Sequence, residues 1–518
     1  MHDTAGYLTF DEFVAHWSRE RPQAIAHVQD DRVTTYGELD DLTRRMAALF
    51  AHEGVARGDR VAWIGKNADL YYQLFFAAGR MGVVMVPVGW RLAPPEMAYI
   101  LRDTGAKLVF AGEGFADLAR TLAAELPAVT RVFDETEARA AIAAQQPSSF
   151  EPGGPDDGVL QLYTSGTTGN PKGVTLTNRN VFGLRRAGLD AGQPWSRWDE
   201  DEAIMLCMPA AHIGGTGLSV VALTGGARGI VHAEFEPGRA LEAIEQGITR
   251  FFIVPAALQM VIQHPKAAET DFSRLKYVMY GAAPIPLELL REAVTTMPNA
   301  GFMQCYGMTE TTGTICVLPP DDHDLAGNER MRSAGRAVPG VEIKIVDAAG
   351  DEVPLGTVGE IVTRSTANMA AYWNLPEATA ATRSADGWVR TGDAAYMDAE
   401  GYVFIQDRVK DMIITGGENV YPAEVESAIY GHPDVAEVAV FGVPDAKWGE
   451  AVKAACVARP GHTIDEDSVI AWARTRIAGF KAPKSVDVIA ALPRNPTGKI
   501  LRRALRDPYW EGRTRQVN

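Results

Sequence analysis

The sequence predicts an α/β protein, with a large amino-terminal lobe of layered α/β/α subdomains and a small α+β domain at the carboxyl terminus, joined by a hinge. Short apolar runs typical of strands, from RVAWIGKN to KYVMYGAAP, alternate with helical patterns along most of the chain. Such alternation favours largely parallel sheets covered by helices on both faces. A chain of 518 residues also exceeds what one hydrophobic core usually supports, so more than one domain is expected.

The large lobe is expected over residues 1–409. Thr9 and Glu12 have capping-box spacing, so a helix should begin directly after Thr9. The apolar run YYQLFFAAGRMGVVMVPVGW is interrupted by Arg80 and glycines, which predicts a buried helix followed by a strand rather than a membrane span. The segment at 146–158, QPSSFEPGGPDDG, is rich in turn formers and is the expected break between subdomains.

The carboxyl-terminal segment, residues 410–518, has a different texture, because short helices alternate there with short strands such as VAEVAVFGV and SVDVIA. Its entry, DRVKDMIITGGENVYPAE, combines a Gly-Gly pair with charged and polar residues, which is typical of a hinge. We therefore expect a small, mobile α+β domain.

Charge and cysteine content narrow the class of protein. The formal net charge of −16 argues against a nucleic-acid binder, which would need a basic face. The widely scattered cysteines have no metal-ligand spacing and predict reduced, buried thiols in a cytoplasmic protein; they are Cys207, Cys305, Cys316 and Cys456. No signal peptide and no transmembrane segment are expected. Peripheral membrane contact and a homodimer are left open.

The stretch LYTSGTTGNPKGV at 162–174 predicts a phosphate-binding loop. An apolar strand runs into a segment rich in glycine and hydroxyl side chains, whose backbone N–H groups can converge on an anion. A lysine adds a movable positive charge. The loop is not of the Walker type, because Gly166 and Gly169 are too close together and Lys172 precedes Gly173 rather than Ser or Thr.

This loop resembles the signature of the adenylate-forming enzymes, which include acyl- and aryl-CoA synthetases, luciferases and the adenylation domains of peptide synthetases. Further matching segments follow in the family's order: PAAHIGG (209–215), YGAAPIP (280–286), QCYGMTE (304–310), GWVRTGD (387–393), DRVKDMIITGGENVYPAEVE (407–426) and PRNPTGK (493–499). Together they are very specific and span nearly the whole chain. The overall similarity is greatest to the fatty-acyl-CoA ligases.

The resemblance implies two half-reactions with ATP, Mg²⁺ and coenzyme A. The substrate's own carboxylate attacks the α-phosphorus of ATP, and a thiol then attacks the acyl carbon and releases AMP. No side-chain nucleophile is needed, and no G-x-S-x-G motif is present. The protein would then act by positioning the reactants and neutralising charge.

By resemblance, Tyr306 would stack on adenine and Asp393 would accept hydrogen bonds from the ribose hydroxyls. Arg408 would reach the sugar or the phosphates; the alternative for it is a salt bridge to Asp407 or Asp411. The full implied ATP-binding set is Thr164, Ser165, Gly166, Thr167, Thr168, Gly169, Lys172, Gly281, Ala282, Ala283, Tyr306, Gly307, Met308, Asp393 and Arg408.

The implied catalytic residues are Lys499, Glu310, Thr309 and His212. Glu310 and Thr164 match the Mg²⁺ position, and Lys499 would bridge the substrate carboxylate and the α-phosphate during adenylation only. Thr309 would contact the α-phosphate. His212 would orient the acyl group, with an acid–base role or a purely structural histidine as alternatives.

For the second half-reaction the resemblance implies a hinge at Lys410 and a CoA tunnel lined by Gly416, Gly417 and Trp448. The implied acyl pocket comprises Gly214, Gly215, Val254, Met279, Met303 and Gly313, with Gly281, Gly307 and Met308 beside it. None of these residues is charged, which favours a fatty acid, with an aromatic acid such as a hydroxycinnamate or benzoate as the alternative. No carrier-protein motif follows the small domain, so an attached thiolation domain is not expected; a stand-alone enzyme that loads a separate carrier protein is a further alternative.

Overall fold

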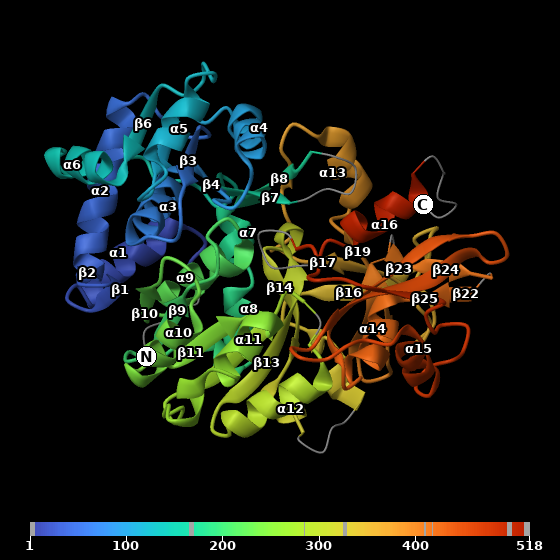
Figure 1. The fold of residues 1–518 in the computed structure, drawn as a ribbon. Helices are drawn as coiled ribbons and strands as arrows, with labels where there is room; N and C mark the ends of the chain where they lie inside the picture. The colour runs from blue at the N-terminus through green and yellow to red at the C-terminus, as the bar shows by residue number, and fades with distance from the viewer. Residues whose placement is uncertain are drawn as a thin grey trace.

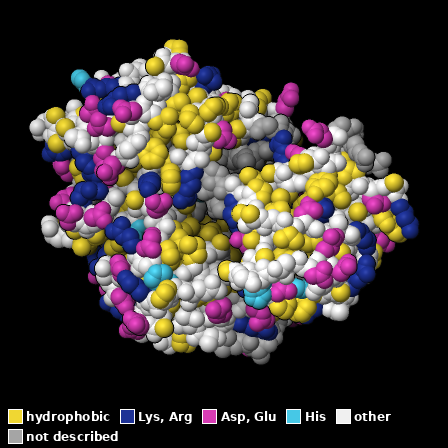
Figure 2. Space-filling view, in the orientation of Figure 1, with side chains coloured by type: hydrophobic (Ala, Val, Ile, Leu, Met, Phe, Trp, Pro, Cys, Tyr) yellow, Lys and Arg dark blue, Asp and Glu magenta, His cyan; other side chains and the backbone are white. Residues whose placement is uncertain are grey.

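The computed structural model describes residues 6–511 except 165–169, 284, 325–328, 409–410, 417 and 495–499. Two large sheets form most of the amino-terminal lobe, and two smaller sheets follow them along the chain (Figure 1). The face drawn in Figure 2 is hollowed where the large lobe meets the smaller carboxyl-terminal part.

The first large sheet has seven strands in the order β18-β8-β7-β4-β3-β5-β6. Its core strands are parallel, whereas β8 and β18 are antiparallel to their neighbours. The strands are β3 (Arg60–Ile64), β4 (Val84–Val88), β5 (Leu108–Ala111), β6 (Arg131–Asp134), β7 (Gly158–Thr164), β8 (Lys172–Thr177) and β18 (Ala371–Tyr372). Because strands on both sides of residues 146–158 belong to this one sheet, that segment does not separate two sheets.

The second large sheet has nine strands in the order β15-β14-β13-β12-β11-β9-β10-β1-β2. They are β1 (Ile25–Gln29), β2 (Arg32–Thr35), β9 (Ala203–Leu206), β10 (Arg228–Val231), β11 (Arg250–Ile253), β12 (Tyr277–Gly281), β13 (Gly301–Met308), β14 (Gly313–Leu318) and β15 (Arg336–Ala337). The expected strands of the large lobe are confirmed as β3–β7, β9, β11 and β12.

Helices fill three layers of the large lobe. One hydrophobic core contains residues of both large sheets together with α1 (Phe10–Glu20), α2 (Tyr36–His52), α3 (Asp69–Met81) and α9 (Ile213–Thr224). On the outer side of the seven-stranded sheet lie α4 (Pro94–Thr104) and α5 (Ala116–Ala123). On the outer side of the nine-stranded sheet lie α10 (Pro237–Glu245), α11 (Pro255–Ile262) and α12 (Leu287–Thr296). The remaining helices of the lobe are α6 (Glu135–Ala144), α7 (Asn178–Phe182), α8 (Arg185–Asp190) and α13 (Pro376–Thr382).

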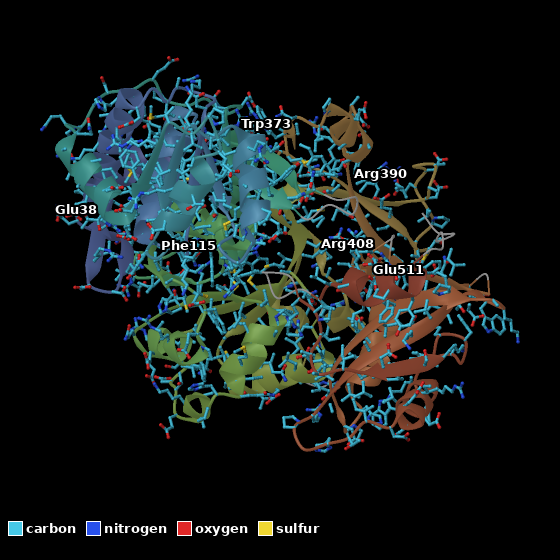
Figure 3. All side chains as sticks on the ribbon, turned by 45° about the horizontal axis from the view of Figure 1, so that its top comes forward. Glu38, Phe115, Trp373, Arg390, Arg408 and Glu511 are labelled. Carbon is cyan, nitrogen blue, oxygen red and sulfur yellow. The ribbon has the colours of Figure 1, made fainter. Side chains whose placement is uncertain are left out.

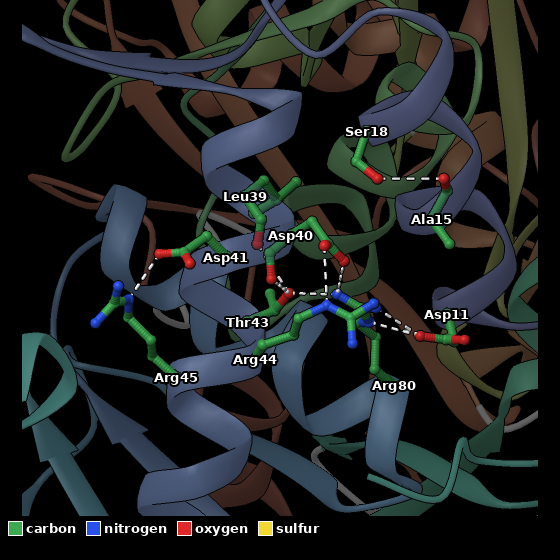
Figure 4. A network of polar contacts seen from close by, with 10 residues as sticks. All are labelled: Asp11, Ala15, Ser18, Leu39, Asp40, Asp41, Thr43, Arg44, Arg45 and Arg80. Carbon is green, nitrogen blue, oxygen red and sulfur yellow. Dashed lines mark hydrogen bonds and ion pairs between the residues drawn. The ribbon is translucent and has the colours of Figure 1, made fainter. Parts of the chain in front are cut away.

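The charged residue that interrupts the long apolar run, Arg80, is buried with its charge compensated (Figure 4). Its guanidinium forms ion pairs with Asp11 of α1 (2.7 Å) and Asp40 of α2 (2.7 Å), and it donates to the hydroxyl of Thr43 (2.6 Å). The run is therefore a buried helix, α3, followed by a strand, β4, as expected. The capping box at Thr9 is also confirmed. Within the described residues, no helix is long and apolar enough to cross a membrane.

A four-stranded antiparallel sheet, in the order β16-β17-β19-β20, was not expected from the sequence. It comprises β16 (Glu342–Val346), β17 (Gly359–Arg364), β19 (Val389–Met397) and β20 (Val403–Arg408). Several of its residues are only partly buried, so the strands lack the continuous apolar runs that mark the parallel strands.

The carboxyl-terminal part has its own hydrophobic core and its own five-stranded sheet. The strands are β21 (Ile413–Thr415), β22 (Glu418–Val420), β23 (Val435–Asp445), β24 (Gly449–Ala458) and β25 (Ser485–Val488). The helices are α14 (Pro422–Tyr430), α15 (Glu466–Arg474) and α16 (Arg502–Trp510). This is the expected small α+β domain; its boundary at residue 409 and its mobility stay predictions.

Candidate functional site

The predicted phosphate loop joins two antiparallel strands. Thr164, the last residue of β7, lies directly opposite Lys172, the first residue of β8. The hairpin therefore holds a hydroxyl and an ammonium group at the same end of the seven-stranded sheet. The predicted phosphate contacts at 165–169 lie outside the described residues.

Glu310 lies beside this hairpin, on a single 3-10 turn that follows β13 and also carries Thr309. The Thr164 hydroxyl donates to Oε1 of Glu310 (3.4 Å), and the Tyr372 hydroxyl donates to the same oxygen (2.8 Å). Burial and the charge of Glu310 raise the pKa of Tyr372, which keeps its hydroxyl protonated as a donor. The structure thus brings together the two residues predicted to hold Mg²⁺.

These oxygens fit the chemistry of the expected metal. Hydroxyl and carboxylate oxygens suit Mg²⁺, which is usually held by one or two protein groups together with substrate phosphates and water. Within the described residues, no group of three or more His, Cys, Asp or Glu side chains could form a metal cage of its own. When bound, Mg²⁺ would neutralise phosphate charge between Glu310, Thr164 and Lys172.

A second cluster is formed by Tyr306, Asp393 and Arg408, from β13, β19 and β20. The Tyr306 hydroxyl donates to Oδ2 of Asp393 (2.7 Å), and Nε of Arg408 contacts Oδ1 (2.8 Å). Burial and the neighbouring carboxylate raise the pKa of Tyr306. Arg408, labelled in Figure 3, is the last residue of β20 and lies at the entry to the small domain. The predicted ribose carboxylate and adenine platform are therefore adjacent.

The alternative for Arg408 is a salt bridge to Asp407 or Asp411. Its side chain pairs with Asp393, whereas Asp407 and Asp411 both lie near Arg502 of α16, at 3.5 and 4.0 Å. That alternative salt bridge is absent from the ion pairs of the described residues, and the contact of Arg408 with the sugar or the phosphates stays a prediction. The backbone N–H of Arg408 does donate to Asp407 (2.7 Å).

Close packing of neighbouring strands explains why glycine occupies two positions of the predicted adenine site. A Cβ at Gly281 would clash with the carbonyl oxygen of Cys305 on the neighbouring strand, and a Cβ at Gly307 would clash with that of Gly313. Ala282, beside Ala283, has a left-handed backbone, with φ of 64°. The small residues at 281 and 307 therefore let β12, β13 and β14 approach closely, in addition to any space that they leave for a flat base.

The predicted acyl pocket is built around three neighbouring parallel strands. Phe252, Met279 and Met303 are direct neighbours in register across β11, β12 and β13. A Cβ at Gly214, on α9, would lie 3.3 Å from the Phe252 ring. Val254 follows β11 as the N-cap of α11.

The glycines of this pocket do not all have the same surroundings. Gly313 has φ of 100° and faces Ile213, which precedes Gly214. A Cβ at Gly215 would clash with the backbone carbonyl of Pro209, so Gly215 is required by the turn into α9 rather than by the pocket alone. Met308 lies opposite Gly313 at the end of the β13–β14 ladder.

His212 is the N-cap of α9, and its carbonyl accepts from the backbone N–H groups of Gly215 (2.9 Å) and Thr216 (3.1 Å). Burial, with a smaller effect from the positive charge of Arg91, lowers the pKa of His212 to about 4. The imidazole is therefore neutral near pH 7, which suits an orienting role better than proton donation.

In the small domain, Gly416 and Trp448 are in contact. The Gly416 N–H donates to the Trp448 carbonyl (2.8 Å), and a Cβ at Gly416 would lie 2.8 Å from the indole ring. The predicted hinge Lys410, the tunnel residue Gly417 and the catalytic Lys499 lie outside the described residues.

Comparison with known proteins decides the family. A family model described as "AMP-binding enzyme" matches residues 14–373, and one described as "AMP-binding enzyme C-terminal domain" matches residues 424–499. The chain belongs to the AMP-binding enzyme family. It is an adenylate-forming acid–thiol ligase with a large amino-terminal and a smaller carboxyl-terminal domain.

Similar AMP-binding enzymes differ in their named acids and acceptors. The fatty acid–[acyl-carrier-protein] ligase ScoC of Streptomyces coeruleorubidus is 40% identical over 504 residues, which is 97% of this chain and 96% of ScoC. A feruloyl-CoA synthase of an Amycolatopsis species is 38% identical over 496 residues, covering 94% and 96%. The crystal structure of ATP-bound MatB from Rhodopseudomonas palustris has a TM-score of 0.88 at 30% identity, covering 97% of this chain and 99% of MatB.

Three residues of the candidate site were missed by sequence reasoning. No short sequence pattern marks Tyr372 or Arg91 as a site residue, because their partners, Glu310 and His212, lie far away along the chain. Phe252 could have been found, since the two-residue period of a strand places it on the same face as Val254.

Proposed function

We propose that the protein is an ATP-dependent fatty acid–CoA ligase that converts acid, ATP and CoA into acyl-CoA, AMP and pyrophosphate. The observation that carries this proposal is that Thr164 lies beside both Lys172 and Glu310. Tyr306 and Asp393, from two different sheets, are hydrogen-bonded to each other. One group of side chains suits a magnesium-bound polyphosphate and the other suits a nucleoside.

In the first half-reaction, the substrate carboxylate oxygen attacks the α-phosphorus, and pyrophosphate leaves. Glu310 and Thr164 would hold the metal, while Lys172 and residues 165–169 would bind the β- and γ-phosphates. Thr309 and Lys499 would contact the α-phosphate, and Lys499 would also hold the carboxylate. This division of labour relies on positioning and charge neutralisation rather than on a covalent enzyme intermediate.

In the second half-reaction, the thiolate sulfur attacks the acyl carbon, AMP leaves, and the thiol proton is released to solvent. Rotation of the small domain about Lys410 would remove Lys499 and bring Gly416, Gly417 and Trp448 to the thiol path. A lid or domain motion of this kind separates two chemistries in one cleft.

The choice of a fatty acid is supported by the apolar strand surface of Phe252, Met279 and Met303. This surface has no charged side chain that could bind a second polar group of the substrate, beyond its reacting carboxylate. The similarity to ScoC, named as a fatty acid ligase, points the same way. The aromatic alternative is favoured by the similarity to a feruloyl-CoA synthase. Phe252 is also a suitable neighbour for an aromatic ring.

The acceptor has a second candidate. ScoC is named as a ligase that uses an acyl-carrier protein, and it is similar to this chain along almost its whole length. A carrier protein presents its thiol on the same kind of flexible arm as coenzyme A. A fatty acid–carrier-protein ligase is therefore the alternative function, and a cytoplasmic location is expected for either.

The test is a pyrophosphate-release screen with fatty acids of graded length and a panel of hydroxycinnamates and benzoates. Each active acid is then tested for thioester formation with CoA and with a phosphopantetheinylated carrier protein. We expect the highest kcat/KM with a fatty acid and CoA. Higher kcat/KM with an aromatic acid, or thioester only on the carrier protein, would replace the proposal by the matching alternative.

Lys499→Ala separates the half-reactions. We expect it to abolish adenylation while thioester formation from supplied acyl adenylate largely persists. Equal loss of both in a folded variant would contradict the proposed two-step division. Absence of labelled-pyrophosphate exchange into ATP with every acid would overturn the proposed reaction itself.

A further inference from the structure

A two-residue strand connects the metal-binding and phosphate-binding parts of the proposed site. β18 pairs antiparallel with β8, so that Tyr372 lies opposite Val174. Three residues before Tyr372, the backbone N–H of Met369 donates to the carbonyl of Glu310 (2.8 Å). The backbone around β18 is thus bonded both to the strand that begins with Lys172 and to the turn that carries Glu310.

The Tyr372 side chain also contacts both parts of the site, Glu310 and Lys172. Its hydroxyl donates to Oε1 of Glu310 (2.8 Å), and its ring centre lies 4.9 Å from Nζ of Lys172. Only 7% of Tyr372 is exposed, so water competes poorly for either contact. One side chain therefore contacts both an acidic and a basic group of the site.

The two hydroxyl donors act on the same carboxylate oxygen. Thr164 and Tyr372 both donate to Oε1 of Glu310, and among the described residues no donor to Oε2 is present. A carboxylate fixed through one oxygen keeps the lone pairs of the other available for a cation.

We propose that Tyr372 is a positioning residue for the magnesium–ATP complex: its hydroxyl orients Glu310 toward the metal, and its ring holds Lys172 for the phosphates. This role rests on the proposed function of Glu310 and Lys172. The hydroxyl and the ring have separate tasks, so they can be removed one at a time.

Trp373, the residue directly after β18, holds the strand in place through contacts that do not involve the Tyr372 side chain. The Trp373 N–H donates to the carbonyl of Gly173 (2.7 Å), and its indole N–H donates to the carbonyl of Asp103 (2.9 Å). The Arg60 guanidinium lies 3.4 Å from the centre of the Trp373 ring, and Trp373 is labelled in Figure 3. Variants at Tyr372 should therefore keep the strand in place.

The experiment measures ligand binding by Tyr372→Phe and Tyr372→Leu without any acid substrate, so that no reaction occurs. Mn²⁺, a paramagnetic substitute for Mg²⁺, is titrated in the presence of ATP and followed by electron paramagnetic resonance. ATP binding in EDTA is followed by calorimetry.

We expect Tyr372→Phe to raise the Kd for Mn²⁺ about tenfold, because a hydrogen bond to a charged group is lost, and to leave ATP binding in EDTA within about twofold of wild type. Tyr372→Leu should weaken Mn²⁺ binding similarly and also raise the Kd for ATP in EDTA about two- to fivefold, because Lys172 loses its aromatic neighbour.

Tyr402→Phe is the matched control. Its hydroxyl donates to Asp322 (2.7 Å) in another part of the molecule, and both residues are buried. Its Kd for Mn²⁺ should equal that of wild type. Equal Mn²⁺ binding by Tyr372→Phe and wild type would overturn the inference, as would an equal loss in Tyr402→Phe or a Tyr372→Phe protein that does not fold. Failure of wild type to bind Mn²⁺ and ATP would instead overturn the proposed function.

Discussion

Asp393 and Arg408 lie directly opposite each other in the β19–β20 ladder, and their side chains meet at 2.8 Å between Oδ1 and Nε. The backbone register therefore places Arg408 against one oxygen of the Asp393 carboxylate. Tyr306, from a different sheet, donates a hydrogen bond to the other oxygen. A carboxylate held on both sides loses little conformational entropy when it binds a ligand, which is the usual advantage of a preorganised site.

Removing only the Tyr306 hydroxyl should weaken ATP binding while leaving the aromatic ring. We expect Tyr306→Phe to raise the KM for ATP five- to thirtyfold in pyrophosphate exchange, since a hydrogen bond to a charged group is worth about 1 to 2 kcal/mol in a partly solvated site. Asp393→Asn should have a larger effect, because it also leaves the Arg408 charge uncompensated. An unchanged KM in both variants would show that this cluster does not bind the nucleotide.

Gly307→Ala should destabilise the protein, because its Cβ would clash with the carbonyl oxygen of Gly313. Overpacking of this kind typically costs about 1 to 3 kcal/mol, so a fall in Tm of about 1 to 3 °C is expected in calorimetry for a chain of this size. Gly479→Ala is the control, because a Cβ there meets nothing within 4 Å. Equal Tm values for the two variants would contradict the close approach of the strands.

Gly416→Ala should affect the second half-reaction selectively. The new Cβ would press on Trp448, and the backbone φ of 61° disfavours a side chain. Backbone strain of this kind costs about 1 to 3 kcal/mol. We therefore expect thioester formation from supplied acyl adenylate to be about tenfold slower, and pyrophosphate exchange to change less than about twofold.

The matched control for Gly416→Ala is Gly461→Ala, in the same domain. Gly461 has a φ of 81°, and a Cβ there meets nothing within 4 Å. This control separates backbone strain from contact with Trp448. Equal slowing of both half-reactions by Gly416→Ala would argue against a role in the thiol path.

His27 should make stability depend on pH. It is fully buried against Tyr72 and Phe76, and neither ring nitrogen has a hydrogen-bond partner among the described residues. Burial lowers the pKa of His27 to about 4, from an ordinary value of 6.5, and Asp69 offsets this only partly. Between these values the unfolded chain binds a proton that the folded protein does not, so stability is full above pH 6.5 and falls as the pH drops toward 4.

His27→Leu should remove this dependence. Between pH 6.5 and 4.5 we expect the variant to lose less stability than wild type, by about 2 kcal/mol. Urea unfolding monitored by tryptophan fluorescence at several pH values measures the difference. Parallel pH profiles would mean that His27 is protonated as easily in the folded protein as in the unfolded chain.

Local patterns determined much of the fold. The capping box at Thr9, the buried helix and strand around Arg80 and the apolar strands β3–β7, β9, β11 and β12 follow from residue patterns within short segments. The four-stranded sheet of β16, β17, β19 and β20 was not predicted, because its half-buried strands carry little apolar periodicity.

The sequence by itself determined which chemistry the chain carries, because glycines, hydroxyls, a lysine and a glutamate stand in short segments of recognisable order. Only the tertiary structure decided which of these groups meet. Thr164 and Glu310 are 146 positions apart, and Tyr372 is 62 positions beyond Glu310, yet all three converge on one carboxylate oxygen. Contacts over such separations depend on strand order and register, which local periodicity does not encode.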